Sequence, residues 1–336
     1  MNKIYIDKDL MMMKKILKEN IFYIIAIILV YIISNYRLPY YVSAPGGIIN
    51  INDRIEYSEL KEYKGSLNML YVTQYEATIP IYLMSYIMED WDLEPIEENQ
   101  IANENHEEID KRNKIMLDNS INNAIYVGYK AANKEIKISS KKHLIFAVIS
   151  DAKLKIGDEI LQINDQDIDD FNMIKDIIQS NNIGDVLKFN IKRDGKIKEV
   201  DVEIKDIDGE KGIGIMVMTN YEYDTNPKIE LKFRQSESGS SGGMMMALSI
   251  YSAISDNDIL KGKNIAGTGT IDIEGNVGPI GGIKYKIMGA VKNNMDVILV
   301  PSDNYKEALE VVKEKDYDIE LVEVKHFNDA ISYLTK

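Results

Sequence analysis

Hydrophobic residues form one long block near the N-terminus of the chain. No charged residue occurs from Asn20 to Tyr36, a run of 17 residues that contains the segment IFYIIAIILVYIIS. In a helix such a run is about 25 Å long, which is just enough to cross a bilayer that thins slightly. The pattern therefore predicts a transmembrane helix over residues 21–37.

The charges around this block predict its orientation. Five lysines precede it within residues 1–20, whereas only Arg37 follows it closely. Because positively charged flanks stay in the cytoplasm, we expect residues 1–20 to be cytoplasmic and residues 38–336 to lie outside. A cleaved signal peptide is the alternative, but Pro45 disfavours cleavage at the only small-residue site, Val42-Ser43-Ala44.

The segment after the block mixes strand and helix patterns. Proline and glycine residues in 39–52 indicate a turn that leads into an extended segment. Residues 65–80 are expected to form a strand and then a loop, and residues 81–90 a helix. The polar run 90–113 is interpreted as a solvated loop or surface helix without chemistry.

Helical periodicity predicts an amphipathic helix over residues 118–132, with Asp118 as its cap. A β-rich pattern follows. Leu144–Ile149 is an apolar run typical of a buried strand, and Glu159–Asp165 alternates and ends in a turn. We expect a helix over Phe171–Gln179 and then a hairpin that turns at Asp194-Gly195.

From Gly212 onward, strands and helices alternate, as in α/β proteins. The helix predicted over Met244–Ile254 is apolar nearly all round, so it should be buried. Asp296–Pro301 has the pattern of a fully buried strand. The other elements expected here are strands at 212–218, 228–234 and 319–324, and helices at 283–291, 304–313 and 327–334.

Composition narrows the possible functions. The net charge of −14 argues against nucleic acid as a partner. No cysteine is present, which excludes disulfides, thiolate nucleophiles and cysteine-based zinc sites. The three histidines are scattered and none lies in an HExxH motif, so no metal or other cofactor is expected. No GxxxxGK[ST] motif is present, and we therefore expect no P-loop ATPase.

Two segments carry candidate chemistry. Ser240 and Ser241 lie in the sequence GSSGG just before the buried helix, where backbone N–H groups can hold an oxyanion. An ordinary helix start, with serine as cap and glycine in the loop, is the alternative. The second segment is a glycine-rich hairpin that delivers Lys284 and Lys286 to the start of a helix. A desolvated lysine can lose its proton near neutral pH and act as a base.

Together the two segments predict a Ser–Lys peptidase site, but periodicity does not choose between the lysines. At about 100° per residue, Lys284 and Lys286 fall on opposite margins of the apolar face formed by Ile283 and Ile287.

These segments resemble the proteolytic domain of the Lon family of Ser–Lys peptidases, over roughly residues 212–336. The GSSGG context matches the family's G-P-S-A-G, and this match implies that Ser241 is the nucleophile. Ser240 stands where the family has proline, and Gly242 stands where it has alanine.

The resemblance also assigns the base. Pro279–Lys286 matches the family segment P-I-G-G-x-K-x-K, whose second lysine is catalytic, so the resemblance implies Lys286. Thr268, in Thr268-Gly269-Thr270, matches a family threonine near that lysine and is expected to hydrogen-bond it.

The sequence KIGDEILQINDQDI resembles the centre of a PDZ domain, with Asp165 where that family has glycine. The resemblance implies peptide binding by strand addition to a sheet edge. The alternative is a β-rich spacer that binds nothing, because the usual carboxylate-binding loop is not recognisable before Leu144.

The whole chain resembles the membrane-anchored PDZ–Lon-like proteases of Gram-positive bacteria. The fold implied is an α/β (α+β) Lon-type proteolytic domain, with a PDZ-like domain inserted in it or adjoining it, behind one transmembrane helix. The expected division is 1–20 cytoplasmic, 21–37 transmembrane, 38–140 the first part of the Lon-type domain, 141–206 PDZ-like and 207–336 the proteolytic domain with the dyad.

The function implied is that of an ATP-independent serine endopeptidase, anchored by a single pass in the cell membrane and facing outward. It would cleave peptides or unfolded extracytoplasmic proteins that the PDZ-like segment captures, and Lon-like domains suggest a homo-oligomeric ring.

Two alternatives stand beside this interpretation. GSSGG also matches the G-x-S-G-G of trypsin-like proteases, for which His143 would have to be the base, but the α/β pattern contradicts a double β-barrel. The other alternative is a catalytically inactive, membrane-bound scaffold that binds peptides.

Overall fold

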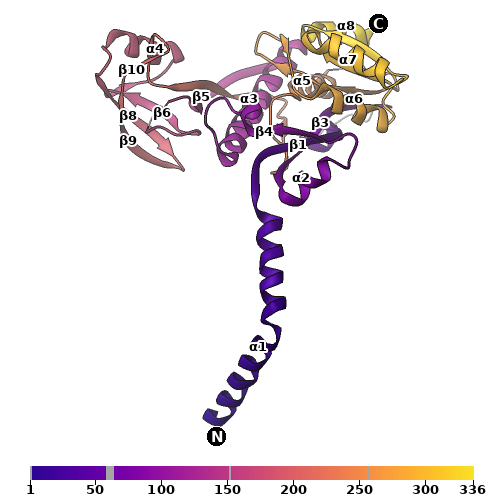
Figure 1. Ribbon diagram of the computed structural model, residues 1–336. Coiled ribbons are helices and arrows are strands. Elements are labelled where there is room, and N and C mark those ends of the chain that lie inside the picture. Colours follow the sequence, from indigo (N-terminus) through magenta and orange to yellow (C-terminus); the bar gives the residue numbers. More distant parts are fainter. Residues whose placement is uncertain (1, 58–63, 151–152, 256–257) are drawn as a thin grey trace. The chain divides into compact units, whose positions relative to one another are not determined.

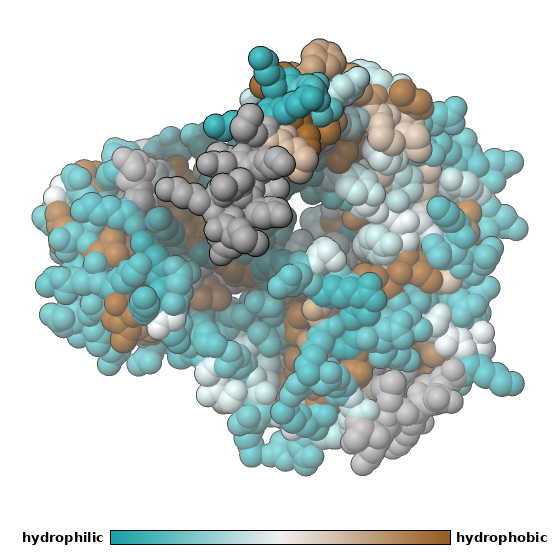
Figure 2. All heavy atoms as spheres, turned by 90° about the horizontal axis from the view of Figure 1, so that it is seen from below, coloured by the Kyte–Doolittle hydropathy of each residue, from teal (hydrophilic) through white to brown (hydrophobic). Residues whose placement is uncertain are grey.

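The computed structural model describes residues 2–57, 64–150, 153–255 and 258–336 (Figure 1). The chain forms two compact units. The first consists of Met1–Ala44 and Gln74–Glu98, and the second of Pro45–Thr73 and Asn99–Lys336. Hydrophilic residues predominate on the face shown in Figure 2, where hydrophobic residues form separate patches between them.

Helix α1 (Asn2–Asn35) opens the first unit. Its segment Lys14–Asn35 is 22 residues long, has a mean hydropathy of 2.2 and is not buried, so by length and composition it can cross a membrane. Signal sequences near an N-terminus share these properties. The helix ends at Asn35, and Arg37, the last residue of the predicted transmembrane segment, begins strand β1.

Strand β1 (Arg37–Asn50) replaces the turn predicted in residues 39–52. In the first unit, its residues Tyr40–Ser43 pair antiparallel with β4 (Asp92–Pro95). The loop predicted before residue 80 is also wrong, because β3 (Ser66–Thr78) runs directly into helix α2 (Ile79–Ser85). Pro80 explains why this helix begins earlier than expected, since proline fits the first turn of a helix.

The second unit contains a parallel sheet. Its strands lie in the order β18 (Glu320–Val324), β17 (Val297–Pro301), β14 (Asn264–Gly267) and β3, and all three pairs are parallel. In the sheet, the second half of β1 lies next to β3. A Cβ atom at Gly46 would lie 1.9 Å from the carbonyl oxygen of Tyr71, so only glycine permits this approach. Gly46, which the sequence analysis assigned to a turn, therefore allows β1 and β3 to approach each other.

Successive side chains along these strands point to opposite faces of the sheet, so they pack into two hydrophobic cores, one on each face. Val297 and Leu299 join the core that contains helix α5 (Gly243–Ile254), and Ile298 and Val300 join the core that contains helix α6 (Ile283–Lys292). Residues of α3 (His106–Ala131) and α8 (Phe327–Thr335) complete the first core, and residues of α7 (Ser302–Glu314) complete the second. The sheet is thus covered by helices on both faces, which buries β17 as its apolar pattern predicted.

Helix α3 begins 12 residues before the predicted start at residue 118. Asp118 is therefore not its cap. Asn105 is the cap instead, because its side chain accepts from the backbone of Glu108 while the Glu108 side chain accepts from the backbone of Asn105.

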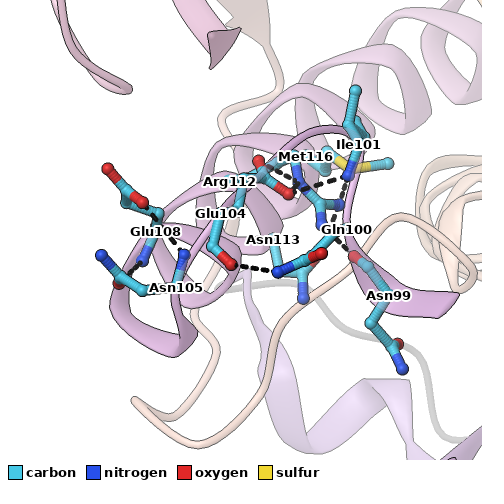
Figure 3. A network of polar contacts seen from close by, with 9 residues as sticks. All are labelled: Asn99, Gln100, Ile101, Glu104, Asn105, Glu108, Arg112, Asn113 and Met116. Atoms are coloured by element: carbon cyan, nitrogen blue, oxygen red, sulfur yellow. Dashed lines mark hydrogen bonds and ion pairs between the residues drawn. The ribbon is translucent and has the colours of Figure 1, made fainter. Parts of the chain in front are cut away.

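A buried ion pair fixes the start of α3 (Figure 3). Arg112 donates from Nε to both carboxylate oxygens of Glu104, at 2.9 and 3.1 Å, and from Nη2 to the carbonyl of Asn99. The same carboxylate accepts the backbone N–H of Ile101. Glu104 is 4% exposed and Arg112 7% exposed, so this pair departs from the solvated loop or surface helix predicted over 90–113, whereas Glu107, Glu108 and Lys111 are exposed as predicted.

A β-rich segment with its own core lies between α3 and α5. Its strand order is β12-β5-β6-β8-β9, and the predicted helix is α4 (Phe171–Ser180). Asn164 and Asp165 adopt φ values of 51° and 61°, which aspartate tolerates, so Asp165 can stand where the PDZ family has glycine. The strands are β5 (Glu135–Val148), β6 (Glu159–Ile163), β7 (Gln166–Asp167), β8 (Val186–Arg193), β9 (Lys196–Glu203) and β12 (Ile215–Asn226).

Residues on both sides of this β-rich segment share one core. Ala124 and Val127 of α3 pack in the same cluster as the apolar residues of α5. Strand β13 (Glu230–Leu231) is shorter than the predicted 228–234 and pairs with β2 (Ile55–Glu56). The remaining elements are η1 (Ile51–Arg54), η2 (Ile96–Asn99), β10 (Lys205–Ile207), β11 (Glu210–Gly212), β15 (Thr270–Ile271) and β16 (Val277–Gly278).

Candidate active site

Ser240 and Ser241 lie directly before α5, whose 12 residues are all buried, as the sequence predicted. The N–H of Gly243 donates to the carbonyl of Ser240 at 3.2 Å. Within the described part of the chain, the N–H groups of Ser241 and Gly242 donate no hydrogen bond to the backbone. These two donors at a helix N-terminus are therefore available to an oxyanion.

The packing around Gly242 accounts for glycine at a position where the Lon family has alanine. A Cβ atom at this position would lie 2.6 Å from Sδ of Met69, which belongs to the neighbouring strand β3. Such a contact is too short unless the Met69 side chain moves. The side chain of Met69 thus occupies the space that a Cβ atom at residue 242 would need.

Thr268 follows strand β14 and is fully buried. Its N–H donates to the carbonyl of Leu299 in β17 at 3.1 Å, so the threonine is fixed to the sheet. Its hydroxyl donates to the carbonyl of Ser241 at 3.0 Å, and the N–H of Gly269 donates to the same carbonyl at 2.7 Å. Two donors from one segment therefore hold the backbone of Ser241.

Lys286 lies in the first turns of α6, with its side chain inside the protein. Gly282 caps this helix with φ 66°, a left-handed conformation that favours glycine. Lys286 is 3% exposed, and its Nζ donates to the hydroxyl of Thr268 at 3.1 Å, which is the hydrogen bond expected for Thr268. Burial disfavours the charged amine and lowers the pKa of Lys286 to about 7.

Lys284, the other lysine of the pair, differs in its environment. It is only half-buried, and its Nζ lies 5.4 Å from the centre of the Tyr285 ring. Burial therefore separates two lysines that helical periodicity placed on equivalent margins of α6.

The structure links Lys286 to the serine segment through Thr268. Among the described residues, no hydrogen bond joins Nζ of Lys286 to the hydroxyl of Ser241. The chain of contacts runs from Nζ to the threonine hydroxyl and on to the Ser241 carbonyl. The lysine is thus positioned against the backbone of Ser241 rather than against its side chain.

Sequence reasoning missed Ser120 of helix α3. Its hydroxyl donates to the carbonyl of Ser240 at 3.0 Å, and the residue is 2% exposed. The sequence does contain a sign of this role. Ser120 lies four residues before Ala124 and seven before Val127, which places it on the apolar face of the helix. A polar residue on such a face needs a buried partner.

His143 does not take part in this site. It lies in strand β5, is 3% exposed, and its Nδ1 is 2.9 Å from the hydroxyl of Thr219 in β12. Within the described residues it forms no hydrogen bond with Ser240 or Ser241. Together with the parallel sheet, this placement contradicts a trypsin-like site.

Comparison with known proteins finds similarity in two regions of the second unit. Residues 234–336 match the Lon protease (S16) C-terminal proteolytic domain, and residues 145–204 match the PDZ domain. Lon protease 2 of Borreliella burgdorferi is 30% identical over 118 residues, which are 34% of this chain and 15% of that protein. The Lon protease of Mesomycoplasma hyopneumoniae is 35% identical over 98 residues, 29% of this chain and 11% of that protein.

Among solved structures, the PDZ domain of the SdrC-like protein from Listeria monocytogenes is 28% identical. It covers 24% of this chain and 92% of that domain, with a TM-score of 0.23. The chain spans only a small part of the length of the Lon proteases that it matches. The chain is thus similar to a Lon-type proteolytic domain of serine peptidases and to a PDZ domain in the two regions where the motifs predicted them.

Burial of Lys286 predicts a pH dependence of stability. The pKa of this side chain falls from 10.5 to about 7 on folding, so between these values the unfolded chain binds more protons. The contribution of Lys286 to the stability of the folded chain is therefore most unfavourable below pH ~7, and it disappears as the pH rises through ~10.5. Lys286→Met should raise the midpoint of thermal unfolding at pH 7, and this gain should shrink toward pH 10.

The measurement is thermal unfolding of the full chain in detergent at a series of pH values. Lys284→Met, which changes a half-buried lysine two residues away, is the matched control and should show no comparable gain. Equal gains in both variants, or a gain independent of pH, would contradict the assignment.

Proposed function

We propose that Ser241 and Lys286 form the catalytic dyad of a serine endopeptidase, on the premise that residues 234–336 are a Lon-type proteolytic domain. One observation carries the proposal. Lys286 is buried, has a pKa of about 7 and is connected through Thr268 to the segment that presents Ser241. A general base is most effective when its pKa lies near the working pH.

In this mechanism, neutral Lys286 accepts the proton of the Ser241 hydroxyl. The serine oxygen then attacks the peptide carbonyl carbon, while the N–H groups of Ser241 and Gly242 stabilise the oxyanion. The lysine ammonium donates its proton to the leaving amine as the C–N bond breaks. Water next attacks the acyl-enzyme and passes a proton to Lys286, which returns it to Ser241.

The geometry without substrate fits this scheme in part. Nζ of Lys286 donates to Thr268, not to Ser241, so the serine hydroxyl has to approach Nζ when substrate binds. Catalytic hydrogen bonds often tighten in this way only in the complex. Ser240 has a different role in the proposal, because its carbonyl connects the serine segment to Ser120 of α3.

The same proposal places the enzyme at a membrane. Helix α1 would be retained as a single-pass anchor of the cell membrane, with residues 1–20 in the cytoplasm and residues 38–336 outside. Substrates would then be extracytoplasmic peptides or unfolded proteins. The finer assignment, to the membrane-anchored proteases of Gram-positive bacteria, remains a prediction.

We place the PDZ-like domain at residues 141–206, as an insertion in a Lon-type domain whose parts are 38–140 and 207–336. The core shared by α3 and α5 supports this division. In the proposal the PDZ-like domain captures substrate by adding it as a strand, and hydrolysis proceeds without ATP. A homo-oligomeric ring belongs to the same hypothesis.

Substitution of the dyad gives the direct test. With the full chain in detergent and an unfolded protein as substrate, Ser241→Ala and Lys286→Ala should each lower kcat by about 10³-fold or more, because either change removes the acylation step. Ser240→Ala and Lys284→Ala are the matched controls and should retain most activity.

Two outcomes would refute this scheme. Cleavage that survives Ser241→Ala would exclude Ser241 as nucleophile, and loss of activity only in Lys284→Ala would exclude Lys286 as base. A wild-type chain that binds peptides but never cleaves them would instead support a catalytically inactive scaffold.

Thr268 provides a second test, as a positioning residue for Lys286. Thr268→Val keeps the shape but removes the hydroxyl that bridges Nζ and the Ser241 carbonyl, so kcat should fall about tenfold. Thr268→Ser keeps the hydroxyl and should recover most of the activity. The readout is the pH profile of kcat/KM, which should rise through about pH 7 in the wild type and shift in Thr268→Val but not in Thr268→Ser.

If Thr268→Val left this pH profile unchanged while lowering kcat, the threonine would have only a structural role.

A further inference from the structure

Exposed hydrophobic side chains gather in the first unit, on helix α2 and the residues that follow it. Contiguous exposed patches of this kind mark interaction sites. We call this group the α2 patch. Its exposed fractions are 58% for Leu83, 44% for Met84, 70% for Tyr86, 79% for Ile87 and 43% for Met88.

Aromatic rings connect the α2 patch to the chain near the end of α1. The ring of Tyr82 lies 5.6 Å from the ring of Tyr40 and 5.4 Å from that of Tyr86. The ring of Trp91 lies 5.5 Å from that of Tyr75. Tyrosine and tryptophan combine an apolar body with a polar group, and they are enriched where a membrane meets water.

An ion pair places the patch close to the end of the candidate span. Arg37, two residues after α1, lies 2.7 Å from the carboxylate of Glu76 in strand β3. Helix α2 begins three residues after Glu76, and α1 and α2 lie in contact within the first unit. If α1 crosses the bilayer, Arg37 lies at its headgroups, and α2 therefore lies at the same level.

We infer that the α2 patch inserts into the headgroup region of the bilayer beside the outer end of α1. The inference rests on the proposed anchoring of α1 and adds a second membrane contact to it. Apolar and aromatic side chains provide the binding, as in helices that lie in the plane of a membrane interface. Acidic residues Glu89 and Asp90 follow the patch directly, so neutral lipids should be preferred over anionic ones.

Lipid fits these observations better than a protein partner does. The patch adjoins the span, and its tyrosines and tryptophan are the residue types of an interfacial belt. A second copy of the chain or a peptide would require neither feature. Both remain as outcomes of the experiment below.

The chain offers a direct probe, because Trp91 is its only tryptophan. The full chain is reconstituted into phosphatidylcholine liposomes that contain lipids brominated either near the headgroup or near the chain ends. The emission of Trp91 should lie at shorter wavelength than that of a tryptophan exposed to buffer. Its intensity should fall mainly with the lipids that are brominated near the headgroup (shallow quenching). A second probe, Ile87→Trp combined with Trp91→Phe, should be quenched more strongly, because Ile87 is the most exposed residue of the patch.

Two matched variants sharpen the experiment. Ile87→Asp should abolish shallow quenching of Trp91, whereas Ile197→Asp, at a 73% exposed isoleucine of β9, should leave it unchanged. Replacing part of the phosphatidylcholine with phosphatidylglycerol should reduce the quenching.

Contrary results identify what has failed. Protein that does not float with the liposomes would overturn the anchoring and this inference with it. Protein that floats, but whose Trp91 is quenched by aqueous acrylamide and not by either brominated lipid, would overturn this inference alone. Emission that changes with the protein-to-lipid ratio, or on addition of peptide, without bromine quenching would assign the patch to a second copy or to substrate.

Discussion

The burial of one lysine is the constraint on which the proposed chemistry depends. Lys286 is 3% exposed, and removal from water disfavours its charged form, so its pKa falls to about 7. A large fraction of the amine is then neutral near pH 7 and can accept a proton. A buried amine also needs a hydrogen-bond partner, and the hydroxyl of Thr268 fills that role.

The rest of the second unit holds this arrangement in place. Thr268 directly follows strand β14, and its N–H is fixed by Leu299 of the adjacent parallel strand β17. Its hydroxyl and the N–H of Gly269 both reach the carbonyl of Ser241, at the start of a completely buried helix. Strand, loop and helix therefore meet where parallel strands end, which is where α/β sheets commonly place their sites.

The sequence predicted much of this, for identifiable physical reasons. Met244–Ile254 and Asp296–Pro301 were recognisable because apolar residues predominate in both, as burial on all sides requires. The choice of Lys286 over Lys284 came only from family resemblance, because periodicity cannot show how far a sheet covers a helix margin. The start of α3 was missed because its first turns are polar and largely exposed, and the burial of Arg112 depends on its pairing with Glu104. The strand character of β1 was missed because Gly46 meets Tyr71, a contact between segments distant in sequence.

Covalent labelling of the full chain with a serine-reactive sulfonyl fluoride over a range of pH shows directly whether Lys286 activates Ser241, once mass spectrometry has located the modified residue. A single adduct on Ser241 is expected. Its rate should rise about tenfold per pH unit below pH ~7 and level off above it, and Lys286→Ala should abolish this rise. An adduct on Ser240, or a rate on Ser241 that does not change with pH, would show that Lys286 does not activate Ser241.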